Sequence, residues 1–167
     1  AVELSENIGN GNLPDAKINV VIEDKNNEVW LGTARGIARY ILPDRVIAGN
    51  STDRRAQWLI NADTTAESPF LLRDVNATAL AVNAANQKWV GSAGDGVWLL
   101  NEEGSRILEH FNTQNSPILG NQINSITIDD KTGTVYYATD QGLASYTDVP
   151  KASVEKMSEL KVYPDPF

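Results

Sequence analysis

Apolar and polar residues alternate in short runs along the chain, and three of these runs open segments of similar layout. A polar turn follows each run, and a second apolar run follows the turn. Alternation with a period of two predicts half-buried β-strands, and polar turns between such runs predict hairpins. The three segments cover residues 18–40, 77–100 and 123–146.

Each segment carries the same group of residues after its polar turn. An aromatic residue is followed by an apolar, a small and a hydroxyl residue, and a glycine comes shortly afterwards. The aromatics are Trp30, Trp89 and Tyr136, and the glycines are Gly36, Gly96 and Gly142. We expect the aromatics to be buried between neighbouring sheets. We expect the glycines to close short hairpins in the left-handed conformation, where a Cβ is costly.

Aligning the apolar residues of the first runs, with one turn residue missing in the second copy, extends the repeat to the first strand. This alignment places Val20 with Leu80 and Ile126. It also places an acid or amide six residues before each aromatic, and these three residues are Asp24, Asn83 and Asp130. Each segment therefore predicts three strands.

A fourth strand is predicted less regularly. It is expected at residues 107–111 in the second copy and at either 46–47 or 58–60 in the first copy. No convincing fourth strand follows the third copy before residues 151–159. Residues 50–68 read as a surface insertion in which only Trp58–Ile60 packs, and residues 2–4 look like an outer strand without its own blade.

Repeated units of four antiparallel strands are the blade pattern of a β-propeller. The expected fold class is therefore all-β, with about three four-stranded antiparallel blades that make a partial propeller. A β-sandwich would also contain short, regularly spaced strands, but it has no reason to repeat the aromatic–small–hydroxyl group. Closed propellers have about four to eight blades. We therefore expect further blades before Ala1, and we expect the remaining blades or another copy of the chain to cover the open sheet faces.

The repeats WLGT, WVGS and YYAT, each with its following glycine, resemble the two-component regulator propeller repeat. Residues 111–148 resemble the last blade of secreted proteins of the PorZ type, which belong to the type IX secretion system of Gram-negative bacteria. In that family a β-sandwich domain follows, and LKVYPDPF at residues 160–167 resembles its start, with Asp165 in place of the usual asparagine. The resemblance implies blades at 1–148, a linker at 149–159 and a sandwich from 160, in an extracellular, cell-surface or periplasmic protein.

Composition narrows the possible functions. The formal net charge of −8 disfavours binding to nucleic acid or to an anionic membrane surface. The absence of cysteine excludes disulfides and thiolate chemistry. No apolar run approaches the roughly 18 to 20 residues that a membrane span needs.

The sequence gives little support for a catalytic site or a metal site. His110 is the only histidine, and a structural role is expected for it. The turn at residues 24–28 lacks the glycine and the spacing of a calcium loop. Adjacent carboxylates on a strand point to opposite faces and make poor acid–base pairs. We therefore expect no catalytic residues, no metal site and no cofactor.

The best candidates for binding are the turns between second and third strands, which gather at one mouth of a propeller channel. The residues at these turns are Arg35, Asp95, Asp140 and Gln141. The connection at residues 112–116 is expected on the same face. Loops on a rigid scaffold often carry function, although the same residues are also typical of ordinary polar turns.

These observations favour a non-enzymatic binding or scaffold propeller of a secreted or cell-surface protein, with a protein partner or a surface glycan as its ligand. An association with type IX secretion is implied by the resemblance. The alternative is the periplasmic glycan-sensing propeller of a hybrid two-component regulator. A polysaccharide lyase or hydrolase is supported only by the expected fold, and fold does not determine function.

Overall fold

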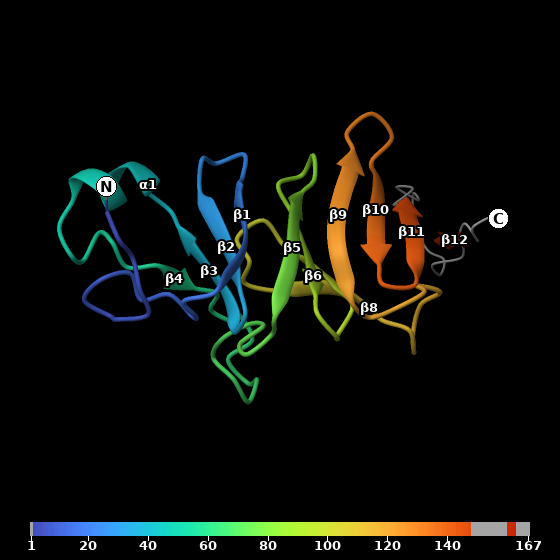
Figure 1. Ribbon diagram of the computed structural model, residues 1–167, viewed down its shortest axis with the longest axis horizontal. Coiled ribbons are helices and arrows are strands. Elements are labelled where there is room, and N and C mark those ends of the chain that lie inside the picture. Colours follow the sequence, from blue (N-terminus) through green and yellow to red (C-terminus); the bar gives the residue numbers. More distant parts are fainter. Residues whose placement is uncertain (1, 148–159, 163–167) are drawn as a thin grey trace.

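Three four-stranded antiparallel sheets stand side by side along the longest axis of the molecule (Figure 1). This computed structural model describes residues 2–147 and the backbone of residues 160–162. The first three strands of each sheet come from the three repeated segments, so the expectation of all-β propeller blades is confirmed.

Each sheet begins with an inner strand and continues outward in chain order. The first sheet contains β1 (Ile18–Glu23), β2 (Val29–Thr33), β3 (Gly36–Tyr40) and β4 (Gln57–Trp58). The second contains β5 (Ala77–Val82), β6 (Lys88–Ser92), β7 (Val97–Leu100) and β8 (Ile107–Phe111). The third contains β9 (Ile123–Asp129), β10 (Thr134–Thr139), β11 (Gly142–Thr147) and β12 (Leu160–Val162).

The fourth strands differ in how well the sequence predicted them. The strand β8 lies at residues 107–111, as predicted. In the first sheet β4 shares Trp58 with the alternative predicted at 58–60, but it begins one residue earlier and does not include residues 59–60. The other alternative was wrong, because Val46 and Ile47 lie in the helix α1 (Pro43–Ala48). Proline at the start of this segment, followed by Asp44 in the first turn, suits a helix rather than a strand.

The fourth strand of the third sheet is β12, which follows the other three at residues 160–162. The strand β12 pairs antiparallel with β11 through Leu160, Lys161 and Val162. The linker predicted at 149–159 lies outside the described residues, and so does the part of segment 160–167 that follows Val162. The sandwich domain therefore remains a prediction.

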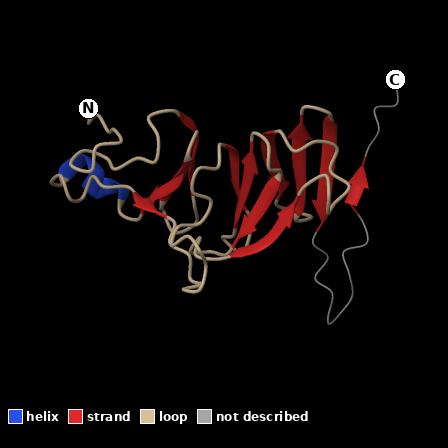
Figure 2. Cartoon of the chain, turned by 90° about the horizontal axis from the view of Figure 1, so that it is seen from below, coloured by secondary structure: helices blue, strands red, loops and turns tan. Residues whose placement is uncertain are grey.

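Residues 2–4 form no strand, contrary to the sequence prediction. They lead into a loop that the Ser5 backbone closes, by donating to Asn10 O at 2.7 Å and by accepting from Leu13 N at 3.1 Å. Leu4 and Leu13 pack with Leu31, Tyr40 and other residues of the first sheet. The N-terminal segment therefore covers the outer face of the first sheet, where α1 also lies (Figure 2).

The sheets stack through two apolar interfaces. Between the first and second sheets, Trp30 and Ile37 pack against Leu80, Val90 and other residues. Between the second and third sheets, Trp89 packs with the ring of Tyr137 and with a further set of apolar residues. The side chains of Trp30 and Trp89 are buried, so the burial expected for these two aromatics is observed.

Tyr136 differs from the two tryptophans. It occupies the same position in its sheet, but it is only half-buried, because within residues 2–147 no further sheet lies over this face. The neighbouring Leu143 is 44% exposed on the same sheet. The third sheet thus ends the described stack with a partly apolar face.

Strand pairing corrects the predicted alignment of the first strands. Val20 pairs with Gly32, and the residues that pair with the equivalent positions 91 and 138 are Ala79 and Ser125. Leu80 and Ile126 therefore correspond to Val21. The alignment by apolar character failed because neighbouring positions in these strands, such as Val20 and Val21, are both apolar.

The turn in the third copy is also displaced. Asp24 accepts hydrogen bonds from Asn26 N and Glu28 N, and Asn83 accepts them in the same way from residues 85 and 87. In the third sheet Asp129, and not Asp130, accepts from Lys131 N. The hairpin there is one residue longer, which shifted the alignment.

The insertion at residues 50–68 consists mainly of exposed loop, as predicted. Leu59 anchors it with only 2% of its surface exposed, and Trp58 extends the first sheet in β4. An isolated antiparallel bridge joins Ile60 to Phe70.

Candidate binding site at the turn end of the sheets

The three turns between second and third strands are built in the same way. A buried hydroxyl donates to the carbonyl oxygen of the turn glycine: Thr33 to Gly36 at 2.8 Å, Ser92 to Gly96 at 3.0 Å and Thr139 to Gly142 at 2.9 Å. All three glycines have positive φ, as predicted. The repeated hydroxyl and glycine thus fix the shape of each turn.

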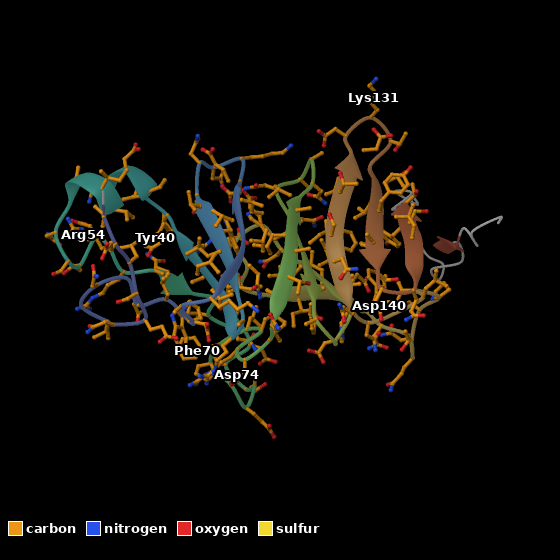
Figure 3. The ribbon with its side chains drawn as sticks, viewed as in Figure 1. Tyr40, Arg54, Phe70, Asp74, Lys131 and Asp140 are labelled. Atoms are coloured by element: carbon orange, nitrogen blue, oxygen red, sulfur yellow. The ribbon has the colours of Figure 1, made fainter. Side chains whose placement is uncertain are left out.

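Each of the first two turns is tied to the segment that leads into the next sheet. Gly36 N donates to Val75 O at 2.7 Å, and Gly96 N donates to Asn121 O at 2.9 Å. These bonds hold the turns and the connections between sheets at one end of the stack. Figure 3 shows Asp74 and Asp140 toward this end, with Lys131 at the opposite end.

The structure places the four predicted binding residues at this end, but in three separate turns. Arg35 forms an ion pair with Asp74, with 3.4 Å between Nη2 and Oδ1. Gln141 donates to the Asp140 carboxylate at 3.0 Å. Asp95 donates its backbone N–H to Ser92 Oγ at 2.8 Å. Ligand binding by these residues remains a prediction.

His110 has the structural surroundings expected for it. Its ring stacks on Trp98 with 4.4 Å between centroids and an interplanar angle of 3°. Its Nε2 donates to the carbonyl oxygen of Asp95 at 2.7 Å. The histidine therefore braces the turn between β6 and β7.

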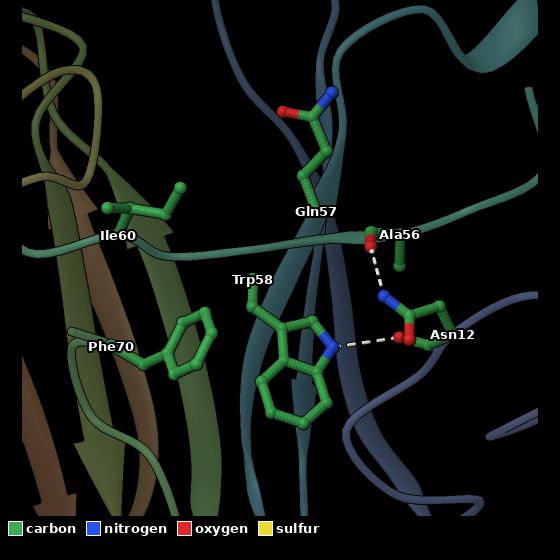
Figure 4. A pocket seen from close by; sticks show the side chains of 6 residues that line it. All are labelled: Asn12, Ala56, Gln57, Trp58, Ile60 and Phe70. Atoms are coloured by element: carbon green, nitrogen blue, oxygen red, sulfur yellow. Dashed lines mark hydrogen bonds between the residues drawn. The ribbon is translucent and has the colours of Figure 1, made fainter. Parts of the chain in front are cut away.

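A groove beside the first sheet was not predicted from the sequence. It has a volume of about 430 Å³, and its lining residues are Asn12, Ala56, Gln57, Trp58, Ile60 and Phe70 (Figure 4). The lining comes from the N-terminal loop, from β4 and from the connection between β4 and β5. Only Trp58–Ile60 carried a sequence signal, as the expected packed part of the insertion.

Two aromatic rings dominate the groove. The rings of Trp58 and Phe70 meet edge to face, with 5.3 Å between centroids and an interplanar angle of 64°. The Cζ atom of Arg73 lies 5.8 Å from each ring centroid. Edge-to-face aromatic pairs and cation–π contacts both favour this arrangement.

Near the groove, two arginine side chains lie close to one carboxylate, that of Asp74. Asp74 lies 3.9 Å from Arg73 Nε and 3.4 Å from Arg35 Nη2. All three side chains are more than half exposed, so these ion pairs contribute little to stability. Two guanidinium groups thus share one carboxylate at this edge of a chain with net charge −8.

Residues 2–147 contain no group of three or more histidine, cysteine or acidic side chains placed to hold a metal ion. No helix in this part of the chain is long and apolar enough to cross a membrane.

Comparison with known families gives one match, in the first repeat. The two component regulator propeller family matches residues 12–35, which include β1 and β2. No curated protein matches the chain in sequence.

Solved structures give a longer match. PorZ, described as an essential bacterial surface component of the type IX secretion system of Porphyromonas gingivalis, is 32% identical with a TM-score of 0.73. The match covers 78% of this chain and 17% of PorZ. The extracellular domain of a hybrid two component system from B. thetaiotaomicron is 25% identical with a TM-score of 0.57, over 81% of this chain and 16% of that chain.

An enzyme is also among the similar structures. An ancestral GH74 enzyme is 14% identical with a TM-score of 0.54, over 81% of this chain and 18% of the enzyme. At this identity the likeness shows the fold alone. In each of these cases the chain spans less than a fifth of the matched protein's length.

Proposed function

Because this chain consists of propeller blades related to PorZ and to the extracellular domains of two-component regulators, we propose that it is a non-enzymatic binding and scaffold module. Its place would be a secreted or cell-surface protein associated with type IX secretion. The observation that carries the proposal is the match to PorZ, which is 32% identical over 78% of the chain.

The chemistry of the turn end supports binding rather than catalysis. Two of the side chains there that could act as acids or bases, His110 and Asp74, already have partners. His110 stacks on Trp98 and bonds to a backbone carbonyl, and the Asp74 carboxylate is shared by two arginines. A rigid end of this kind can present turns to a partner without a reaction. The proposed partner is a protein of the secretion assembly or a surface glycan.

The partly apolar face of the third sheet also supports a scaffold role. Tyr136 and Leu143 lie on this face, and the equivalent faces of the other two sheets are packed. We propose that further blades of a longer protein, or another copy of the chain, pack on it. Repeat arrays need their end faces protected.

A second function is favoured by the other similar structure. The hybrid two component system from B. thetaiotaomicron is 25% identical, and the repeat itself is of the two component regulator type. The alternative is therefore a glycan-sensing propeller in the periplasm.

The location of the full-length protein separates these functions. An antibody raised against the chain, applied to intact cells of the producing bacterium, is expected to label the cell surface. Labelling that requires a permeabilised outer membrane would favour the periplasmic sensor. Labelling that requires lysis of the inner membrane would contradict both functions.

A further inference from the structure

We propose that the groove beside Trp58 and Phe70 binds carbohydrate, with one pyranose ring of an oligosaccharide seated against the two aromatic rings. This inference rests on the proposed function, because it assumes that the chain acts by binding. It adds a site and a class of ligand that the turn-end residues alone do not identify.

The aromatic corner is the first reason. Trp58 is half-buried in the groove lining, and Phe70 meets it at 64° with 5.3 Å between centroids. The face of an aromatic ring is electron-rich, and one face of a pyranose presents weakly positive C–H groups. A sugar ring can therefore stack on one aromatic while its edge contacts the other. Ile60 extends the apolar surface and is 66% exposed.

The corner is also held rigidly before any ligand arrives. The Trp58 indole N–H donates to Asn12 O at 2.8 Å, which fixes the plane of the ring. The Asn12 amide donates to Ala56 O at 3.1 Å, and Ala56 N donates to Gly11 O at 2.6 Å. These bonds fasten the N-terminal loop to β4. Such preorganisation lowers the entropy that binding costs.

One polar side chain lies beside the apolar surface, and one charged side chain lies over its rings. Gln57 is exposed beside Trp58, and its carboxamide can both donate and accept hydrogen bonds. The Arg73 guanidinium lies 5.8 Å from the centroids of both rings and is about half exposed. An apolar floor with a few polar groups at its edge matches a sugar, which has C–H faces and a girdle of hydroxyl groups.

The size of the groove favours a small ligand over a protein surface. Its volume of about 430 Å³ falls in the range of roughly 300 to 1,000 Å³ for small-molecule sites. A stable protein interface buries about 800 Å² on each partner, which is more than this corner offers. Two lining residues, Gln57 and Ile60, are exposed, as a site for one unit of a longer chain should be.

Tryptophan fluorescence gives a direct test on the full chain. Three of the four tryptophans are buried, with exposed fractions of 0% for Trp30, 2% for Trp89 and 7% for Trp98. Quenching by acrylamide therefore reports mainly on Trp58. The probes are soluble hexasaccharides of cellulose, mannan, xylan, chitin and polygalacturonate. At least one of them is expected to protect Trp58 from acrylamide in a saturable way.

Variants then locate the bound saccharide. Saturation-transfer NMR, which does not depend on Trp58 fluorescence, should show binding at least about tenfold weaker for Trp58→Ala and for Phe70→Ala, the loss expected for one aromatic contact. Lys131→Ala changes an exposed residue at the opposite end of the molecule and should bind like the wild type. Trp58→Phe, which keeps an aromatic ring, should retain most of the binding. Circular dichroism checks that each variant is folded.

The outcomes distinguish the site from the proposed function. A lack of binding to every probe, or binding that Trp58→Ala and Phe70→Ala leave unchanged, would overturn the groove as a carbohydrate site. Neither result would contradict a non-enzymatic module on the cell surface. Cleavage of a probe would contradict the proposed function itself.

Discussion

Lys88 of the second sheet places its ammonium group 2.7 Å from the carboxylate of Asp24 in the first sheet, and both side chains are fully buried. The carboxylate also accepts a hydrogen bond from Trp30 Nε1 at 3.1 Å. The ammonium donates to the carbonyl oxygens of Asn86 and Glu102 and lies 4.6 Å from the centroid of Trp30. This network joins the first two sheets through charge as well as through apolar packing.

The next pair of sheets lacks this arrangement. Asn83 and Val135 occupy the positions equivalent to Asp24 and Lys88, so neither position carries a charge at this interface. Trp89 Nε1 has no hydrogen-bond partner among residues 2–147 and 160–162. The two interfaces of the stack are therefore not interchangeable, and the ion pair distinguishes them.

Removing one partner of the pair should be costly. Lys88→Met is expected to destabilise the chain by about 3 to 5 kcal/mol, because it leaves the Asp24 carboxylate buried without a compensating charge. Asp24→Asn combined with Lys88→Met should recover most of the loss, since the other interface works without charges. Urea unfolding followed by circular dichroism measures both free energies. Equal losses in the single and double variants would show that the pairing of charges is unimportant.

The same pair predicts how stability depends on pH. Burial alone would raise the pKa of Asp24, but hydrogen bonds from Lys88 and from the backbone of Glu28 and Asn26 hold its pKa below the ordinary value. A carboxyl whose pKa is lower in the folded state stabilises the fold above its unfolded pKa, and this contribution is lost as the pH falls.

The urea midpoint should therefore fall as the pH is lowered below about 4, the ordinary range for aspartate. The double variant Asp24→Asn with Lys88→Met lacks this group, and its midpoint should fall less over the same range. The exposed carboxyls Asp63, Glu102 and Asp129, whose pKa values are also lowered, remain in both proteins. Parallel curves for the two proteins would contradict this explanation.

The repeated aromatics should differ in their contribution to stability. Trp30→Ala and Trp89→Ala are each expected to cost roughly 3 to 5 kcal/mol, because both rings are buried between sheets. Tyr136→Ala should cost only about 1 kcal/mol, since its ring is half-buried on the outer face of the third sheet. Chemical denaturation of the three variants compares them. A cost for Tyr136→Ala equal to that of the tryptophans would indicate that something covers this face.

Close approach between sheets should make Gly91 sensitive to substitution. A Cβ at this position would lie 2.5 Å from Cγ2 of Ile123 in the third sheet. Gly91→Ala is therefore expected to destabilise the chain by about 1 to 3 kcal/mol through overpacking. Gly94, where an added Cβ meets nothing within 4 Å, provides the control. Gly94→Ala should change the unfolding free energy by no more than about 0.5 kcal/mol.

The blades could be predicted from the sequence because their signals are local. Alternation within each strand and the hydroxyl–glycine closure at Thr33 and Gly36 depend on neighbours in the chain, and both were realised. The errors arose where the signal was ambiguous. Val20 was matched to Leu80 because the neighbouring positions Val20 and Val21 are both apolar, and residues 46–47 are apolar in the helix as they would be in a strand.

The groove and the buried ion pair could not be predicted because they depend on contacts between distant segments. Asn12, Trp58 and Phe70 meet only when the N-terminal loop folds onto β4. Lys88 is the one residue of the pair whose burial the sequence indicates, since this lysine directly precedes Trp89 at the start of an apolar strand. A charged residue in such a place needs a buried partner, but the sequence does not say which acid provides it.

Incubation of the chain with the five hexasaccharides tests most directly the claim that it is a non-enzymatic module. Proton NMR of the five hexasaccharides, recorded over several days at neutral pH, follows their anomeric and unsaturated-sugar signals. We predict that these signals keep their positions and intensities at every time point, as the proposed non-enzymatic module requires. New reducing-end signals, or the vinyl signals of an elimination product, would contradict a non-enzymatic module.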